Sequence, residues 1–157
     1  MDTPHQWRFF RSGGFDQVRL ETATDLKSLG ELDPKLWAAL SCPTSNLEFD
    51  SKTLEFIDTD ADSHIRVPEI IAAVNWITSL LKNAEDLTRG ADSLPLDAID
   101  DSTPEGMALL ASAKQILQNI GKHEEFVISI EDTADLNRIF ASTTFNGDGI
   151  IPPNAAT

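Results

Sequence analysis

Four carboxylates in one short segment have the types and the spacing to bind a divalent metal ion. Asp58, Asp60 and Asp62 alternate with other residues, and Glu69 follows eleven residues after Asp58. Calcium takes roughly six to eight oxygen ligands, so its site needs several carboxylates on one folded stretch. A tightly turning loop can aim the three aspartates at one point, and Glu69 can reach back from the next helix with both oxygens. We therefore predict a calcium site here.

The segment 58–69 resembles the calcium loop of the EF-hand superfamily, and the resemblance extends to its flanks. Ile65 stands at the eighth position, where that family pairs with a partner loop, and apolar residues lie before and after the loop. The resemblance implies one helix on each side of the loop. It implies these ligand positions: Asp58, Asp60 and Asp62 through side chains, His64 through its carbonyl, Arg66 at the water position, and Glu69 with both oxygens.

Two residues depart from the family pattern. Ser63 occupies the sixth position, where the family has glycine because the backbone turns with positive φ; a non-glycine residue there costs roughly 1–2 kcal/mol. Arg66 brings a positive charge to the loop, although its side chain can swing outward. Four carboxylates and one guanidinium still leave a charge of −4 + 1 = −3 with His64 neutral. We expect calcium to bind with lowered affinity.

A second, degenerate copy of the pattern lies at 144–155. Asn146, Asp148 and Gly149 take the third, fifth and sixth positions, but Ala155 stands where the bidentate glutamate belongs. We expect this loop to bind calcium weakly or not at all, and to have a structural role in which Ile151 pairs with Ile65. The 74 residues between the two loops (143 − 69 = 74) are more than EF-hand pairs usually have.

The rest of the chain predicts mainly helices, so the expected fold is all-α or nearly so, in a single helical domain over 1–157. Apolar spacing and capping residues predict helices; partial alternation predicts at most short strands. The predicted helices are a short one after Asp33-Pro34, then 51–57, 69–82, 104–120 and 132–140, and the predicted extended segments are 15–20 and 125–130.

Composition excludes several classes of function. The chain of 157 residues has a net charge of −14, which repels phosphate backbones and anionic lipids, so we expect neither a nucleic-acid nor a membrane partner. No apolar run approaches the length of a membrane span. Cys42 is the only cysteine, the histidines are scattered, and no local catalytic motif occurs, so we expect no enzyme.

The function expected from the sequence is calcium binding that is structural or buffering rather than sensing. The alternative is a protein-interaction module whose acidic loop binds no calcium; its aromatic residues would meet a protein partner or a downstream domain, or else complete the core. The first residues lack the basic start and the apolar stretch of a signal peptide, so we expect a cytoplasmic protein. The chain is also similar to the N-terminal regions of large, functionally uncharacterised bacterial proteins that carry an EF-hand-like loop.

Overall fold

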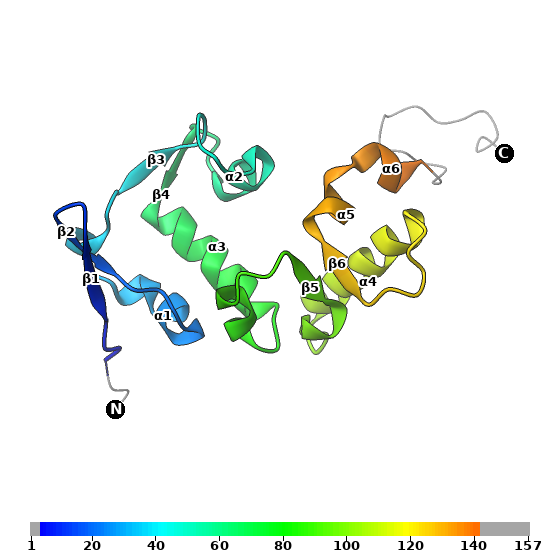
Figure 1. The fold of residues 1–157 in the computed structure, drawn as a ribbon, viewed down its shortest axis with the longest axis horizontal. Coiled ribbons are helices and arrows are strands. Elements are labelled where there is room, and N and C mark those ends of the chain that lie inside the picture. Colours follow the sequence, from blue (N-terminus) through cyan, green and yellow to red (C-terminus); the bar gives the residue numbers. More distant parts are fainter. Residues whose placement is uncertain (1–3, 142–157) are drawn as a thin grey trace. The chain divides into compact units, whose positions relative to one another are not determined.

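The protein forms two compact units, Met1–Ser79 and Leu80–Thr157, in a computed structural model that describes residues 4–141 (Figure 1). The second predicted loop, 144–155, lies outside the described residues.

The predicted all-α class is wrong, because the fold is mixed α/β. The structure contains 47% helix and 16% strand, with the strands in three small antiparallel sheets. Within residues 4–141, four of the six strands have only three residues, too few for alternation to be read from the sequence. Two of the sheets pair strands that are separated in the chain by a helix, so only tertiary contacts create them.

The first unit opens with a hairpin of β1 (Phe9–Ser12) and β2 (Phe15–Val18), in which Phe9 lies opposite Val18. Gly13 and Gly14 form its two-residue turn with φ of 59° and 86°. Glycine suits this left-handed turn, whose twist matches that of the strands. The predicted extended segment at 15–20 is therefore confirmed at β2.

The rest of the first unit runs through short helical turns, a second strand pair and two helices. These elements are α1 (Ala23–Lys27), the 3₁₀ turns η1 (Leu29–Glu31) and η2 (Pro34–Leu36), β3 (Ser41–Pro43), α2 (Ser51–Ile57), β4 (His64–Arg66) and α3 (Val67–Ser79). Both α1 and α2 pack against α3, and the buried apolar side chains of the unit include Leu29, Leu54 and Ile65.

The helix predicted after Asp33-Pro34 shrinks to the single turn η2. Asp33 caps it as predicted, accepting the N–H of Lys35 over 2.9 Å. Trp37 already has extended dihedrals (φ −75°, ψ 129°), and the chain then enters β3. Pairing of β3 with β4 outweighs the helix propensity of the intervening residues.

A buried carboxylate, Asp25, ties the N-terminal segment to α1. Its oxygens accept the N–H groups of Glu21 (3.0 Å) and Thr22 (2.9 Å), and one lies 2.9 Å from His5 Nε2. Burial favours the protonated acid, but these hydrogen bonds outweigh it and lower the pKa of Asp25 from 3.8 to about 2.

The second unit surrounds a long helix. Its elements are η3 (Ala84–Thr88), β5 (Ser93–Pro95), η4 (Leu96–Ala98), α4 (Pro104–Asn119), β6 (Val127–Ser129), α5 (Ile130–Ala134) and α6 (Leu136–Phe140). The apolar core packs α4 against its neighbours and comprises Leu96, Ile99, Ala113, Leu117, Ile120 and Ile139.

Predictions for the second unit are confirmed in outline. Thr103 caps α4 by accepting the N–H of Gly106 over 3.0 Å, and the helix spans most of the predicted range. Gly106 is required here because a Cβ would overlap the backbone carbonyl of Asp100. The helix predicted over 132–140 is instead two short helices, broken at Asp135 (φ −101°, ψ 89°).

Candidate metal centre

The acidic loop 58–69 lies between two helices, as the sequence predicted. Asp58 is the C-cap of α2, β4 follows the turn, and Glu69 lies in the first turn of α3. Asp50 caps the entering helix α2 by accepting the N–H of Thr53 over 2.8 Å. Local sequence thus positions both ends of the loop.

Three of the four predicted carboxylates converge. One oxygen each of Asp58, Asp60 and Glu69 lies within 4.8 Å of the others. Calcium–oxygen distances are about 2.3–2.6 Å, so two oxygens of one calcium shell can be up to roughly 5 Å apart. Asp58 and Glu69 are each only 9% exposed. The donor set and its spacing therefore fit a hard divalent cation.

Glu69 is held in place by both ends of the loop. Its Oε1 accepts the N–H (2.8 Å) and the hydroxyl (3.2 Å) of Thr59, and its Oε2 accepts the N–H of Arg66 (2.8 Å). The Arg66 N–H, followed by the Thr59 donors, lowers the pKa of Glu69 below its ordinary value, although burial opposes this. Oε2 keeps a second lone pair that can face an ion, whereas Oε1 already accepts two hydrogen bonds, so binding through Oε1 requires that it release one Thr59 donor.

The turn itself is built around Asp58. Its carboxylate accepts the N–H of Asp62 over 3.2 Å and that of Ser63 over 2.9 Å. Ser63 has φ of 68°, which confirms the positive φ predicted at the sixth position. Ala61 also turns with φ of 57°, which the sequence did not indicate. The loop therefore contains two left-handed residues that lack glycine's freedom.

Asp62 and Arg66 form an ion pair within the loop. Arg66 Nη2 lies 2.6 Å from Asp62 Oδ2, and Nη1 lies 3.7 Å from Asp60 Oδ2. The hydrogen bond from Arg66 lowers the pKa of Asp62 below its usual value. The guanidinium thus lies over the acidic side chains and does not swing outward, the alternative that the sequence left open.

His64 contributes to the loop through its backbone. Its N–H donates to Asp62 Oδ1 over 2.9 Å, while its ring is exposed. The ligand role expected for its carbonyl stays a prediction.

The strand partner of Ile65 is Cys42, and the predicted pairing of Ile65 with Ile151 lies outside the described residues. β4 pairs with β3 in antiparallel register, with Ser41 opposite Arg66 and Pro43 opposite His64. Thr44 extends the contact, because its N–H donates to the carbonyl of Ser63 over 3.0 Å. The loop is therefore braced by a segment only about twenty residues upstream.

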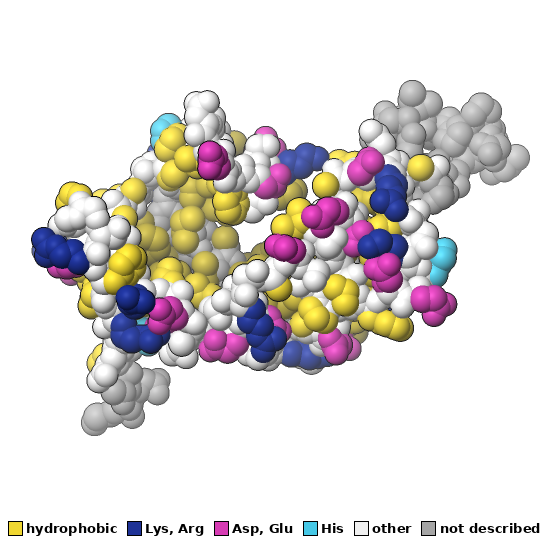
Figure 2. All heavy atoms as spheres, in the orientation of Figure 1, with side chains coloured by type: hydrophobic (Ala, Val, Ile, Leu, Met, Phe, Trp, Pro, Cys, Tyr) yellow, Lys and Arg dark blue, Asp and Glu magenta, His cyan; other side chains and the backbone are white. Residues whose placement is uncertain are grey.

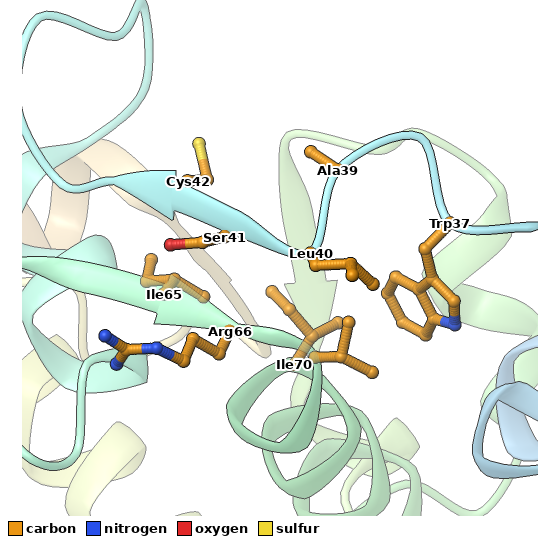
Figure 3. Close-up of a pocket in the computed structure, with 9 residues that line it drawn as sticks. Trp37, Ala39, Leu40, Ser41, Cys42, Ile65, Arg66 and Ile70 are labelled. Carbon is orange, nitrogen blue, oxygen red and sulfur yellow. The ribbon is translucent and has the colours of Figure 1, made fainter. Parts of the chain in front are cut away.

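An apolar groove of about 180 Å³ adjoins the loop within the first unit. Its lining includes Trp37 and Leu40 before β3, and Ile70 on α3, whose side chains turn toward one another (Figure 3). Ile65 and Arg66 also line it, so the loop and the groove share the strand β4.

Sequence reasoning missed two supporting residues of this site. Thr59 holds Glu69, and Cys42 pairs with Ile65. A hydroxyl residue just after the first aspartate was the available signal for Thr59, since threonine often bonds nearby polar groups. Nothing local marks Cys42 as a strand partner.

Comparisons with protein-family models, curated proteins and solved structures give no match for this chain. Among the described residues, every helix is too short or too polar to cross a lipid bilayer.

Proposed function

We propose that the first unit binds one calcium ion in the loop 58–69, with Asp58, Asp60 and Glu69 as carboxylate ligands. The observation that carries this proposal is their convergence, with one oxygen of each within 4.8 Å of the others. Three carboxylates at this spacing repel one another strongly, and a divalent cation relieves that repulsion.

The remaining predicted positions adjust the site rather than define it. Asp62 can join the shell only if its carboxylate exchanges Arg66, 2.6 Å away, for the ion. The guanidinium also places a positive charge 3.7 Å from Asp60. Both effects oppose a bound cation, so we expect the calcium affinity to be lower than that of the same loop without Arg66.

Calcium in this loop would serve stability more than signalling. Glu69 already links the start of α3 to Thr59 beside the end of α2, and an ion on the same carboxylate would strengthen that link. A sensor exposes a flexible, methionine-rich groove on loading, whereas this chain has only Met1 and Met107. We assign the ion a structural or buffering role and assign no catalytic step to this chain.

Calorimetric titration of calcium into chelator-treated protein tests the proposal. We expect one site, and we expect Glu69→Gln to remove most of the binding. Glu55→Gln is the matched control, because it makes the same charge change at an exposed position on α2. An equal loss of calcium affinity in both variants would show that only the net charge of the protein matters. Unchanged affinity in Glu69→Gln would exclude Glu69 as a ligand.

A protein-interaction role is the second candidate, favoured by exposed apolar side chains in the first unit. Leu40 is 58% exposed, Phe49 61% and Phe56 83%, and apolar side chains gather near β3 and α3 in Figure 2. A dye that binds apolar surface separates a structural role of calcium from a sensing role, while the absence of calcium binding in the titration would favour the interaction role alone. If calcium raises the melting temperature without increasing dye binding, the structural role is supported; a calcium-dependent rise in dye binding favours a sensing interaction module.

A further inference from the structure

The second unit repeats the order of elements around the acidic loop. In the first unit α2, β4 and α3 follow one another, and Ile65 of β4 pairs with Cys42. In the second unit α4, β6 and α5 follow one another, and Ile128 of β6 pairs with Leu94. Each strand pair is antiparallel and has three residues a side. Aligning Ile65 with Ile128 makes 121–132 the counterpart of 58–69.

The carboxylates that follow the two strands make hydrogen bonds at the same sequence offsets. Glu69 lies four residues after Ile65, and Asp132 lies four after Ile128. Each accepts the N–H of the residue three before it, from Arg66 over 2.8 Å and from Ser129 over 3.1 Å respectively.

The two loops differ at the residue ten positions before this carboxylate. In the first unit it is occupied by Thr59, whose N–H donates to Glu69 over 2.8 Å. In the second unit it is occupied by Lys122, whose Nζ lies 3.1 Å from Asp132 Oδ1. The carboxylate of Asp132 is only 5% exposed, so its charge needs a partner close by.

Lys122 also contacts a second acid at the register of a predicted calcium ligand. Its Nζ lies 3.1 Å from Glu125 Oε2. Glu125 precedes Asp132 by seven residues, as Asp62 precedes Glu69. The ammonium thus lies between carboxylates at the fifth and twelfth loop positions, where a calcium loop directs two of its ligands at the ion.

We infer that 121–132 is a metal-independent counterpart of the loop 58–69, in which the Lys122 ammonium takes the place of the divalent cation between Glu125 and Asp132. The counterparts of Asp58 and Asp60 are Gly121 and His123, which supply no carboxylate. Both loops contain a basic side chain, but Lys122 contacts the carboxylate at the twelfth position, whereas Arg66 contacts Asp60 and Asp62. Only the comparison between the units rests on the proposed calcium function; the Lys122 contacts stand independently.

Hydrogen exchange read by mass spectrometry on the full chain tests the inference, because it reports each loop separately. Lys122→Met removes the ammonium but keeps a long apolar stem. We expect amide protection over 127–134 to fall roughly tenfold or more, since a buried carboxylate loses its cation. Lys82→Met is the matched control, because Lys82 pairs with Asp101 over 3.0 Å with both side chains about half exposed. An equal fall in amide protection over 127–134 in the two variants would overturn the inference.

A double-mutant cycle with Asp132→Asn keeps the test decisive if Lys122→Met alone unfolds the second unit. Asparagine retains an oxygen for the Ser129 N–H but carries no charge. In the Asp132→Asn background, Lys122→Met should therefore lower the amide protection over 127–134 far less than it does in the unmodified protein. Equal costs in both backgrounds would refute the pairing.

Calcium distinguishes this inference from the proposed function. We expect added calcium to raise protection over 58–69 and to leave 121–134 unchanged in the unmodified protein. Protection by calcium over 121–134 would overturn the inference. No protection over 58–69 would count against the proposed function alone, while the Lys122 cycle would still decide the inference.

Discussion

The left-handed conformation of Ser63 gives a quantitative prediction for the loop. With φ of 68°, Ser63 adopts a backbone conformation that costs an L-residue roughly 1–2 kcal/mol. Ser63→Gly removes that cost but adds about 0.5–1 kcal/mol of backbone entropy lost on folding. The contacts that Ser63 makes come from its backbone, as a donor to Asp58 and an acceptor from Thr44, and glycine keeps them. The midpoints of these two ranges, about 1.5 and 0.75 kcal/mol, give a net stabilisation of roughly 0.75 kcal/mol.

Thermal melting followed by tryptophan fluorescence measures this change in the right place. The three tryptophans of the chain, Trp7, Trp37 and Trp76, all lie in the first unit. For a unit of this size about 1 kcal/mol corresponds to roughly 4–8 °C, so a stabilisation of about 0.75 kcal/mol should raise the melting temperature at saturating calcium by about 3–6 °C.

A matched control separates backbone strain from loss of a side chain. Asn46 also has a positive φ, of 61°, but asparagine tolerates this region, so Asn46→Gly should give a smaller rise. A melting temperature for Ser63→Gly at or below that of the unmodified protein would refute the strain argument. A rise equal to that of Asn46→Gly would show that serine carries no special cost.

Three further predictions concern charge and packing. Arg66→Gln should tighten calcium binding by roughly three- to tenfold at low salt, and this gain should shrink as added salt screens the loop. The control Lys52→Gln on α2 should change the calcium affinity less. Calorimetry at two salt concentrations checks this, and a weaker calcium affinity of Arg66→Gln would contradict it. Because the pKa of Asp25 is lowered from 3.8 to about 2, its ionised form stabilises the first unit fully above about pH 4, and this contribution is lost as pH falls toward 2. Asp25→Asn should therefore flatten the fall in melting temperature over that range, whereas exposed Asp16→Asn should leave it steep. Gly106→Ala should strongly destabilise the second unit, because the added Cβ would overlap the Asp100 carbonyl. Gly30→Ala should be tolerated, since its Cβ would meet only Ile71 Cγ2 at 3.9 Å. Circular-dichroism melts compare the two variants, and equal melting temperatures would refute the overlap.

Elements with strong local signals were predictable from the sequence. Thr103 and Pro104 define the start of α4, and the apolar stripe of the helix carries it to Asn119. The positive φ of Ser63 followed from its loop position. The convergence of Asp58, Asp60 and Glu69 was predicted from their spacing, and the structure brings those three together.

Features that depend on distant partners were not predictable. Ser41–Pro43 pairs with His64–Arg66 and Ser93–Pro95 with Val127–Ser129, and three-residue strands carry too little pattern to reveal either pairing. The all-α expectation failed for this reason. The position of Arg66 over Asp60 and Asp62 likewise depends on the folded loop, since a long side chain has many conformers of similar energy.

The sequence by itself determined where carboxylates gather, where α2 and α4 begin and that Ser63 turns left-handed, because these depend on neighbours within a few positions. The tertiary structure alone decided that Cys42 braces the loop and that Lys122 lies between Glu125 and Asp132. These contacts arise when strands and buried charges find partners across the fold. Such pairing is selected by packing and by the free-energy cost of an unpaired charge, and no local pattern records it.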